Sequence, residues 1–289
     1  AKYWFEKLAR LPVEVEVASE LRYREPPLPA GGVCIAISQS GETIDTLEAL
    51  RYAKRNGQSI LAVVNVPESA IAREAHAVLP TLAGPEIGVA STKAFTTQLT
   101  VLLVAAVAAG RARGTLAEAD AARLANALIE LPSSLNEALG LEVQYKRIAE
   151  DILAAARDVL YIGRGSSFPI ALEGALKLKE ISYIHAEGYA GGEMKHGPLA
   201  LVDRDMPVVC LLPSDSTLEK MLSNVQEVRA RDGRIIAVVD REEVAQGLAA
   251  HVLLVPPTRE PLTPLLTIVP LQLLSYYVAD LRGTDVDQP

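Results

Sequence analysis

Aromatic residues, cysteine and positive charge are scarce in this sequence of 289 residues. Phe, Trp and Tyr together make up 4%, there are two cysteines, and 28 Lys and Arg stand against 36 Asp and Glu, for a net charge of −8. An acidic chain without a basic segment argues against nucleic acid and membrane surfaces as partners. Two cysteines are too few for a disulfide framework. Both lie in apolar segments, so we expect buried free thiols in a reducing compartment, the cytoplasm.

Long hydrophobic runs are missing as well. The longest, residues 101–109 with their neighbours, is shorter than the roughly 20 residues of a membrane span, so we expect neither a span nor a signal peptide. Hydrophobic residues are nevertheless abundant, at 49% against 22% charged. That composition is typical of a globular protein, and the length allows one or two domains.

A long-period repeat is the most informative feature that is present. Cys34 in Val-Cys-Ile-Ala-Ile-Ser matches Cys210 in Val-Cys-Leu-Leu-Pro-Ser, and Gly57 matches Gly233 at the same spacing. A self-match over such a distance predicts two related domains.

Apolar runs of strand length alternate with segments of helical period along the chain. Strands are predicted at residues 33–38, 60–64, 78–79, 159–162, 207–212, 235–239 and 252–255. Helices are predicted at residues 43–56, 91–109, 116–131, 141–157, 170–181, 218–231 and 265–281. The alternation predicts an α/β fold with a parallel sheet flanked by helices in each half. We place the first domain at residues 1–132, and the linker helices with the second domain at residues 133–289.

The two copies differ at their start. Residues 13–17 align with residues 181–185, so the strand at 159–162 and the Gly-Arg-Gly-Ser-Ser loop at 163–167 have no counterpart in the first half. We therefore expect the first copy to lack its first strand and loop, and the sequence to be part of a longer one.

Residues 38–43, Ser-Gln-Ser-Gly-Glu-Thr, lie between a predicted strand and a helix start. Open α/β sheets bind ligands there, and the free N–H groups of a helix N-terminus suit an anion. Ser38, Ser40 and Thr43 add hydroxyl donors, and Gly41 permits close backbone approach. An ordinary N-cap turn has the same composition, so the loop alone leaves both interpretations open.

The equivalent loop of the second half, residues 214–219, separates these interpretations. Asp215 and Glu219 stand where the first copy has Gln39 and Thr43, and two carboxylates would repel a phosphate. The first copy is therefore the predicted phosphate site. A sugar phosphate is favoured over a nucleotide because the Gly-Lys-Ser/Thr ending of a Walker loop is absent.

Two sites in the second half have both a chemical and a structural interpretation. Glu180 follows an apolar helix, where a carboxylate either acts as a general base or pairs with a neighbour such as Lys177. Glu193 and His196 have metal-ligand spacing, but the Gly-Gly pair beside them and the lack of a second ligand pair argue against a metal.

Other charged residues have structural explanations. Lys93 at a helix start needs an acidic or anionic partner, because a cation opposes the helix dipole there; a substrate contact and an ion pair with Glu86 or Glu42 are both open, and the ion pair is favoured. Glu42 is expected to cap its own helix. His76 and His251 occupy equivalent positions in the two copies, as structural residues do.

Three further motifs join the loop at residues 38–43. They are Gly-Val-Ala-Ser-Thr-Lys-Ala-Phe-Thr-Thr-Gln at 88–98, the stretch at 173–181 continuing to Glu-Met-Lys-His-Gly-Pro-Leu at 193–199, and Gly-Thr-Asp-Val-Asp-Gln-Pro at 283–289. Together they resemble the isomerase half of the glutamine:fructose-6-phosphate aminotransferases, or glucosamine-6-phosphate synthases. The resemblance covers essentially the whole chain and implies two tandem SIS (sugar isomerase) domains with a flavodoxin-like three-layer architecture.

The resemblance implies a function without metal or organic cofactor. Fructose 6-phosphate would be converted to glucosamine 6-phosphate with ammonia from a glutaminase domain that this sequence does not contain. Ser38, Gln39, Ser40 and Thr43 would hold the phosphate, and Val89 and Ser91 would contact the sugar. Glu180 would move the proton between C1 and C2 with Lys177 close by. His196 would assist ring opening from the neighbouring subunit, which implies a homodimer.

The sequence also departs from the family. It lacks the N-terminal Cys nucleophile, the first Gly-Thr-Ser loop and the C-terminal lysine that forms a Schiff base with the open sugar. Two other functions remain open at this stage: a sugar-phosphate-sensing SIS module, and a fructosamine-phosphate deglycase that uses the same site.

Overall fold

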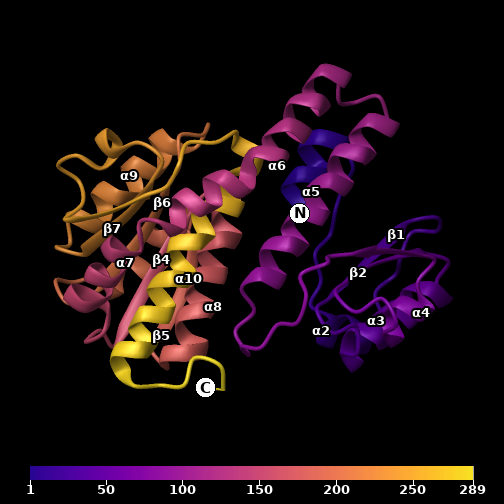
Figure 1. Ribbon diagram of the computed structural model, residues 1–289, viewed down its shortest axis with the longest axis horizontal. Coiled ribbons are helices and arrows are strands. Elements are labelled where there is room, and N and C mark those ends of the chain that lie inside the picture. The colour runs from indigo at the N-terminus through magenta and orange to yellow at the C-terminus, as the bar shows by residue number, and fades with distance from the viewer. Residues whose placement is uncertain (289) are drawn as a thin grey trace. The chain divides into compact units, whose positions relative to one another are not determined.

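The computed structural model describes residues 1–288 and separates into two compact units (Figure 1). Unit 1 comprises Ala1–Glu86 and Ser91–Ala122, and unit 2 comprises Ile87–Ala90 and Arg123–Pro289. The division falls inside helix α6 (Glu118–Leu139), ahead of the boundary expected after residue 132. The short segment Ile87–Ala90 belongs with unit 2 although its neighbours on both sides belong to unit 1.

Unit 1 contains a three-stranded parallel sheet in the order β1-β2-β3. Helix α3 covers it because Leu47, Leu50 and Ala53 recur on one helical face and are buried against Ile60 and Ile71. The elements of this unit are α1 (Lys2–Trp4), η1 (Phe5–Ala9), α2 (Ala18–Arg24), β1 (Val33–Ser38), α3 (Ile44–Arg55), β2 (Ser59–Val64), α4 (Ala70–Glu74), β3 (Ala77–Pro80) and α5 (Lys93–Ala112).

Unit 2 contains a five-stranded parallel sheet in the order β5-β4-β6-β7-β8. Numbered within the unit, this order is 2-1-3-4-5, the flavodoxin-like order. After α6, the elements are α7 (Glu142–Ile148), η2 (Ala149–Leu153), β4 (Asp158–Gly163), α8 (Ser167–Ser182), β5 (His185–Ala190), η3 (Gly191–His196), η4 (Pro198–Leu201), β6 (Pro207–Leu212), α9 (Leu218–Arg229), β7 (Arg234–Val239), η5 (Glu242–Ala245), β8 (His251–Leu254), η6 (Glu260–Leu262) and α10 (Thr263–Arg282).

The duplication is visible in these two sheets. The series β1, α3, β2, β3 repeats as β6, α9, β7, β8, and the predicted α/β fold with a parallel sheet in each half is confirmed. Strand β6 lies between two neighbours and all six of its residues are buried, whereas β1 is an edge strand with Val33 63% and Ile37 41% exposed. Among the described residues of unit 1 no strand corresponds to β4, as the repeat predicted.

A counterpart of β5 is also missing from unit 1, and the sequence analysis did not predict this. The stretch aligned with β5 forms helix α2 instead. In unit 2, β5 pairs with β4 alone. A strand needs a neighbour to satisfy its backbone groups, so without an equivalent of β4 the aligned stretch has no sheet edge to join.

Two helices are long and apolar enough, by length and composition alone, to cross a membrane. They are α5 and the segment Glu260–Arg282, whose apolar windows are 28% and 83% buried within the protein. The expectation that no segment reaches this length was wrong, because it counted only an uninterrupted apolar run and these helices include Thr and Gln. The 83% buried segment contains α10, which packs along α8 and is typical of a core helix (Figure 1).

The two cysteines differ in their environment. Cys210 is fully buried in β6, but Cys34, expected to be its buried equivalent, is only half-buried because β1 is an edge strand. Burial raises the pKa of both thiols, which favours the unreactive protonated form.

Candidate active site

The loop at residues 38–43 closes on itself at the carboxyl end of β1. Ser38 is buried, and its Oγ accepts a hydrogen bond from the Gly41 amide at 3.0 Å and lies 3.2 Å from Thr43 Oγ1. Ser40 Oγ accepts from the Glu42 amide at 3.2 Å. No hydrogen bond within the described chain uses the Ser40 amide. The loop therefore gathers hydroxyl groups and a free amide just ahead of α3, as an anion site requires.

The segment that leads into α4 holds this loop from behind. The amides of Asn65 and Ile71 donate to the carbonyls of Gln39 and Gly41, at 3.1 and 3.0 Å. Gly41 has φ +67°, and a Cβ there would lie 2.0 Å from Ser69 Oγ. Only glycine fits this approach.

Glu42 has a structural role different from the predicted one. Its Oε1 accepts from the Ala70 amide at 2.8 Å, so it caps α4 instead of its own helix. The reason is that α4 begins directly beside the loop, as the Ile71–Gly41 bond shows.

The equivalent loop of unit 2 is filled by its own carboxylates. Asp240 accepts from the Ser214 amide with both oxygens at 3.1 Å and from Ser214 Oγ at 2.6 Å. Asp215 Oδ1 accepts from the amide and the hydroxyl of Thr217, both at 2.7 Å. In unit 1 the position of Asp240 is taken by Asn65, whose neutral amide bonds to Ala83 and Gly84. The donors of Ser214 and Thr217 in the second copy are thus paired with carboxylates, which supports the first copy as the anion site.

Helix α8 carries a row of three charged side chains. Lys177, with 5% of its side chain exposed, lies 2.8 Å from Glu180 Oε2 and 3.5 Å from Glu173 Oε1. The side chains of Glu173 and Glu180 are 16% and 31% exposed. Burial raises the pKa of Glu173. The structure thus brings the predicted pair Lys177 and Glu180 together.

Glu173 was missed by the sequence analysis. Residues 173, 177 and 180 are spaced for one face of a helix, and that spacing was the available signal. It was not used because Glu180 and Lys177 were considered only as a pair.

Close packing fixes the position of this helix. A Cβ on Gly188 of β5 would lie 2.7 Å from the backbone of Leu172, and one on Gly174 would lie 2.6 Å from Leu271 of α10. The two glycines let α8 approach its neighbours at backbone distance, so its charged row has little freedom to shift.

The remaining predicted residues lie in loops. Val89 is 66% exposed, and its amide donates to the Asp287 carbonyl at 3.1 Å. Ser91 is half-buried and precedes α5 in unit 1. His196 is exposed at the end of η3, and Glu193 is exposed in the same turn. Among the described residues no group of His, Cys, Asp and Glu could hold a metal ion.

Two structural expectations can be compared with these loops. The expected ion pair of Lys93 with Glu86 or Glu42 is not formed within the described chain. Glu86 instead accepts from the Ala94 amide at 2.8 Å and caps α5. His76 is structural as expected, since its Nδ1 accepts from the Ile60 amide at 2.8 Å.

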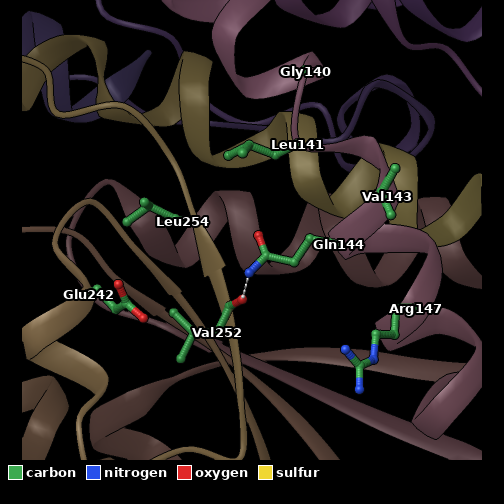
Figure 2. A pocket seen from close by; sticks show the side chains of 8 residues that line it. All are labelled: Gly140, Leu141, Val143, Gln144, Arg147, Glu242, Val252 and Leu254. Atoms are coloured by element: carbon green, nitrogen blue, oxygen red, sulfur yellow. Dashed lines mark hydrogen bonds between the residues drawn. The ribbon is translucent and has the colours of Figure 1, made fainter.

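A hollow of about 510 Å³ lies elsewhere in unit 2, between α7 and β8 (Figure 2). Gln144 bridges it with a hydrogen bond from Nε2 to the Val252 carbonyl, at 2.8 Å. Strand β8 is the edge opposite β5, so this hollow is separate from the charged row of α8 and from the tail of the chain.

Two α/β units, each with a parallel sheet, and a hydroxyl-rich loop between β1 and α3 define the class of protein. The family model described as SIS domain matches residues 1–108 and 152–281, and the chain belongs to that family. The unmatched interval, residues 109–151, contains all of α6 and α7, which connect the two copies.

Within this family the chain is similar to glutamine–fructose-6-phosphate aminotransferase (isomerizing). The protein of that name from Bradyrhizobium diazoefficiens is 59% identical over 291 residues, covering 100% of this chain and 48% of the relative. The one from Mesorhizobium japonicum is 56% identical with the same coverage. The solved C-terminal domain of glucosamine-fructose-6-phosphate aminotransferase from Francisella tularensis is 46% identical, with a TM-score of 0.96, and covers 100% of this chain and 82% of that one. The resemblance drawn from the sequence motifs is confirmed. The chain spans about half the length of the curated relatives.

Proposed function

We propose that this chain isomerises a hexose 6-phosphate between its ketose and aldose forms. In a longer protein this step is coupled to amination, so that fructose 6-phosphate and ammonia from a glutaminase domain give glucosamine 6-phosphate. The names of the relatives, the SIS fold and the residues on α8 support this proposal. The charged row Glu173, Lys177 and Glu180 is the observation that carries it.

Binding is assigned to the loop at residues 38–43. The hydroxyls of Ser38, Ser40 and Thr43, the Gln39 side chain and the free loop amide hold the phosphate through hydrogen bonds. No lysine or arginine is needed, because helix-end amides favour negative charge. Val89 and Ser91 contact the sugar.

Proton transfer is assigned to Glu180. Lys177 holds Oε2 of this carboxylate at 2.8 Å, which leaves Oε1 to take a proton from C1 of the ketose and return it at C2. The electron pair of the broken C1–H bond forms a C1=C2 double bond and the C2 oxygen takes the negative charge, which gives an enediolate; an iminium at C2 gives a neutral enolamine instead. When the proton returns at C2, the proton of the C1 hydroxyl passes to the C2 oxygen and the C1=O bond of the aldose forms. His196 assists ring opening and reaches the site from the partner subunit, so the active form is a homodimer. We place this protein in the cytoplasm.

Turnover tests the proposal directly. The purified protein is incubated with fructose 6-phosphate, and glucose 6-phosphate is measured, or glucosamine 6-phosphate when ammonia is supplied. Glu180→Gln is expected to abolish proton exchange at C1 and C2 while sugar-phosphate affinity stays within a few fold. The exposed Glu193→Gln is the matched control and should keep full activity.

Two results would contradict this assignment. Equal loss of exchange and affinity in Glu180→Gln would make the residue structural. Binding of fructose 6-phosphate by the wild-type protein without any turnover would favour the sensing function over an enzyme.

A further inference from the structure

The last described residues form a compact strap, residues 284–288, that returns to the end of α8 (Figure 1). Helix α10 ends at Arg282, and its C-cap residue Gly283 has φ +69°, which turns the chain. Thr284 Oγ1 then donates to the Ile181 carbonyl at 2.6 Å. Val286 packs on the buried residues Ala90, Ile181 and Ala279. The strap is therefore attached one residue from Glu180.

Asp285 shapes this strap. Its Oδ1 accepts from the amides of Asp287 and Gln288, at 2.9 and 3.1 Å. The resulting turn presents the Asp287 carbonyl, which accepts from the Val89 amide at 3.1 Å. The approach is close, since a Cβ on Gly88 would lie 3.3 Å from Asp287 Oδ1.

The segment Ile87–Ala90 depends on this contact. Ile87 is 81% and Val89 66% exposed. Within the described chain, residues 87–90 make a single backbone hydrogen bond, the one from the Val89 amide to Asp287. Ala90 is buried in the same small cluster that holds Val286. One strap thus anchors the segment that carries Val89 and also the end of the helix that carries Glu180.

We propose that Thr284 and Asp285 are positioning residues for the isomerisation, because the strap they fold fixes the sugar-contacting segment at Val89 relative to Glu180. The inference rests on the proposed function and adds two residues that touch neither substrate nor the reacting atoms. Catalysis is sensitive to such placement, since a shift of about 1 Å can cost around 100-fold in rate.

Asp285→Ala tests this proposal with two measurements. It is expected to lower kcat/KM for fructose 6-phosphate about tenfold and to speed hydrogen exchange of the Val89 amide, with little change in the midpoint of thermal unfolding. Asp285→Asn keeps an oxygen that can accept both amides and should recover most of the activity. Asp203→Ala is the matched control, because Asp203 makes a similar turn by accepting from the Asp205 amide at 2.9 Å.

The outcomes distinguish a failure of the positioning role from a failure of the proposed isomerase function. Unchanged turnover in Asp285→Ala overturns the positioning role, whether or not Val89 exchange rises. If Asp285→Ala fails to fold, Thr284→Val, which removes the hydroxyl's bonds to the carbonyls of Ile181 and Ala279, takes its place with the same expectations. If the wild-type protein shows no turnover, the proposed function fails and the positioning role fails with it. The exchange of Val89 then reports separately whether the strap anchors this segment.

Discussion

At the scale of single residues, Lys177 is the unusual side chain. It is a lysine with 5% of its side chain exposed, and its ammonium lies between two carboxylates. Buried charges are tolerated only when they are paired, so Glu173 and Glu180 stabilise Lys177 as much as Lys177 orients them.

Replacing Lys177 by Met should therefore destabilise the protein. Removal of the lysine leaves two half-buried carboxylates without a counter-charge, which costs up to about 3 kcal/mol in the free energy of unfolding. Urea unfolding measures the change. Lys179→Met removes an exposed lysine from the same helix and should change the free energy by less than about 0.5 kcal/mol. Equal effects of the two substitutions would show that Lys177 is not held as a buried charge.

Asp285 gives a prediction about pH. The amides of Asp287 and Gln288 donate to its carboxylate, so its pKa lies below the usual 3.8. Because the pKa is lower in the folded state, its contribution to the strap is fully present above pH 3.8 and is lost as the pH falls through the folded value. An NMR titration of the side-chain carboxyl should show the low pKa. A value at or above 3.8 would mean that the strap does not form this turn in solution.

The sequence predicted some residues of the site better than others. The serines and Thr43 could be proposed because strand, loop and helix start follow one another without interruption, and the structure places them in one loop at the end of β1. The partner of Glu42 was not found, because Ala70 lies 28 residues further along the chain and only the fold brings it near. Glu86 was assigned to Lys93 by charge alone, whereas the free amide of Ala94 is its nearer partner.

At the scale of elements, the loop at residues 38–43 is held in place by the segment that leads into α4. Three contacts join the loop to the segment at residues 65–71: two between backbones and one through Glu42. The close approach at Gly41 makes this packing possible.

Gly41→Ala should disrupt both the loop and its ligand. The left-handed conformation costs roughly 1 kcal/mol for any L-residue, and the new Cβ would in addition overlap Ser69. Gly57→Ala is the matched control in the same unit, since Gly57 has φ +75° with nothing within 4 Å of the added Cβ. Both variants should be less stable by thermal unfolding, but only Gly41→Ala should lose affinity for fructose 6-phosphate, by tenfold or more. Equal affinities of the two variants for fructose 6-phosphate would show that the loop does not bind the phosphate.

Strand and helix periodicity predicted most elements to within a few residues. Strands β1 and β6 have the predicted bounds, because each is a continuous apolar run with turn residues at both ends. Strand β5 was not predicted, since His185, Glu187 and Gly188 interrupt any apolar pattern. Helix α6 continues seven residues past Pro132, beyond the predicted end at residue 131.

At the scale of the whole molecule, duplication has produced two loops with opposite chemistry. The loop in unit 1 presents hydroxyl donors, and that in unit 2 pairs the donors of Ser214 and Thr217 with Asp240 and Asp215. Comparison of the two copies in the sequence is what singled out the loop of unit 1 as the predicted phosphate site.

Thr43→Ala should weaken fructose 6-phosphate roughly tenfold, because a hydrogen bond to a charged group contributes about 1.5 kcal/mol or more. Glu219→Ala, at the equivalent position of unit 2, should leave the affinity within twofold. Isothermal titration calorimetry on both variants measures the difference. A larger effect of Glu219→Ala would reverse the assignment of the two copies.

The Asp240 carboxylate of unit 2 also has a consequence for the number of hexose phosphates that one polypeptide should bind. Asp240 already accepts the hydrogen bonds of Ser214 in the unit 2 loop, so we expect no phosphate to bind there. Each polypeptide should therefore take up a single hexose phosphate, even though the loop occurs twice. The duplicate can then diverge in its other surfaces without competing for the sugar.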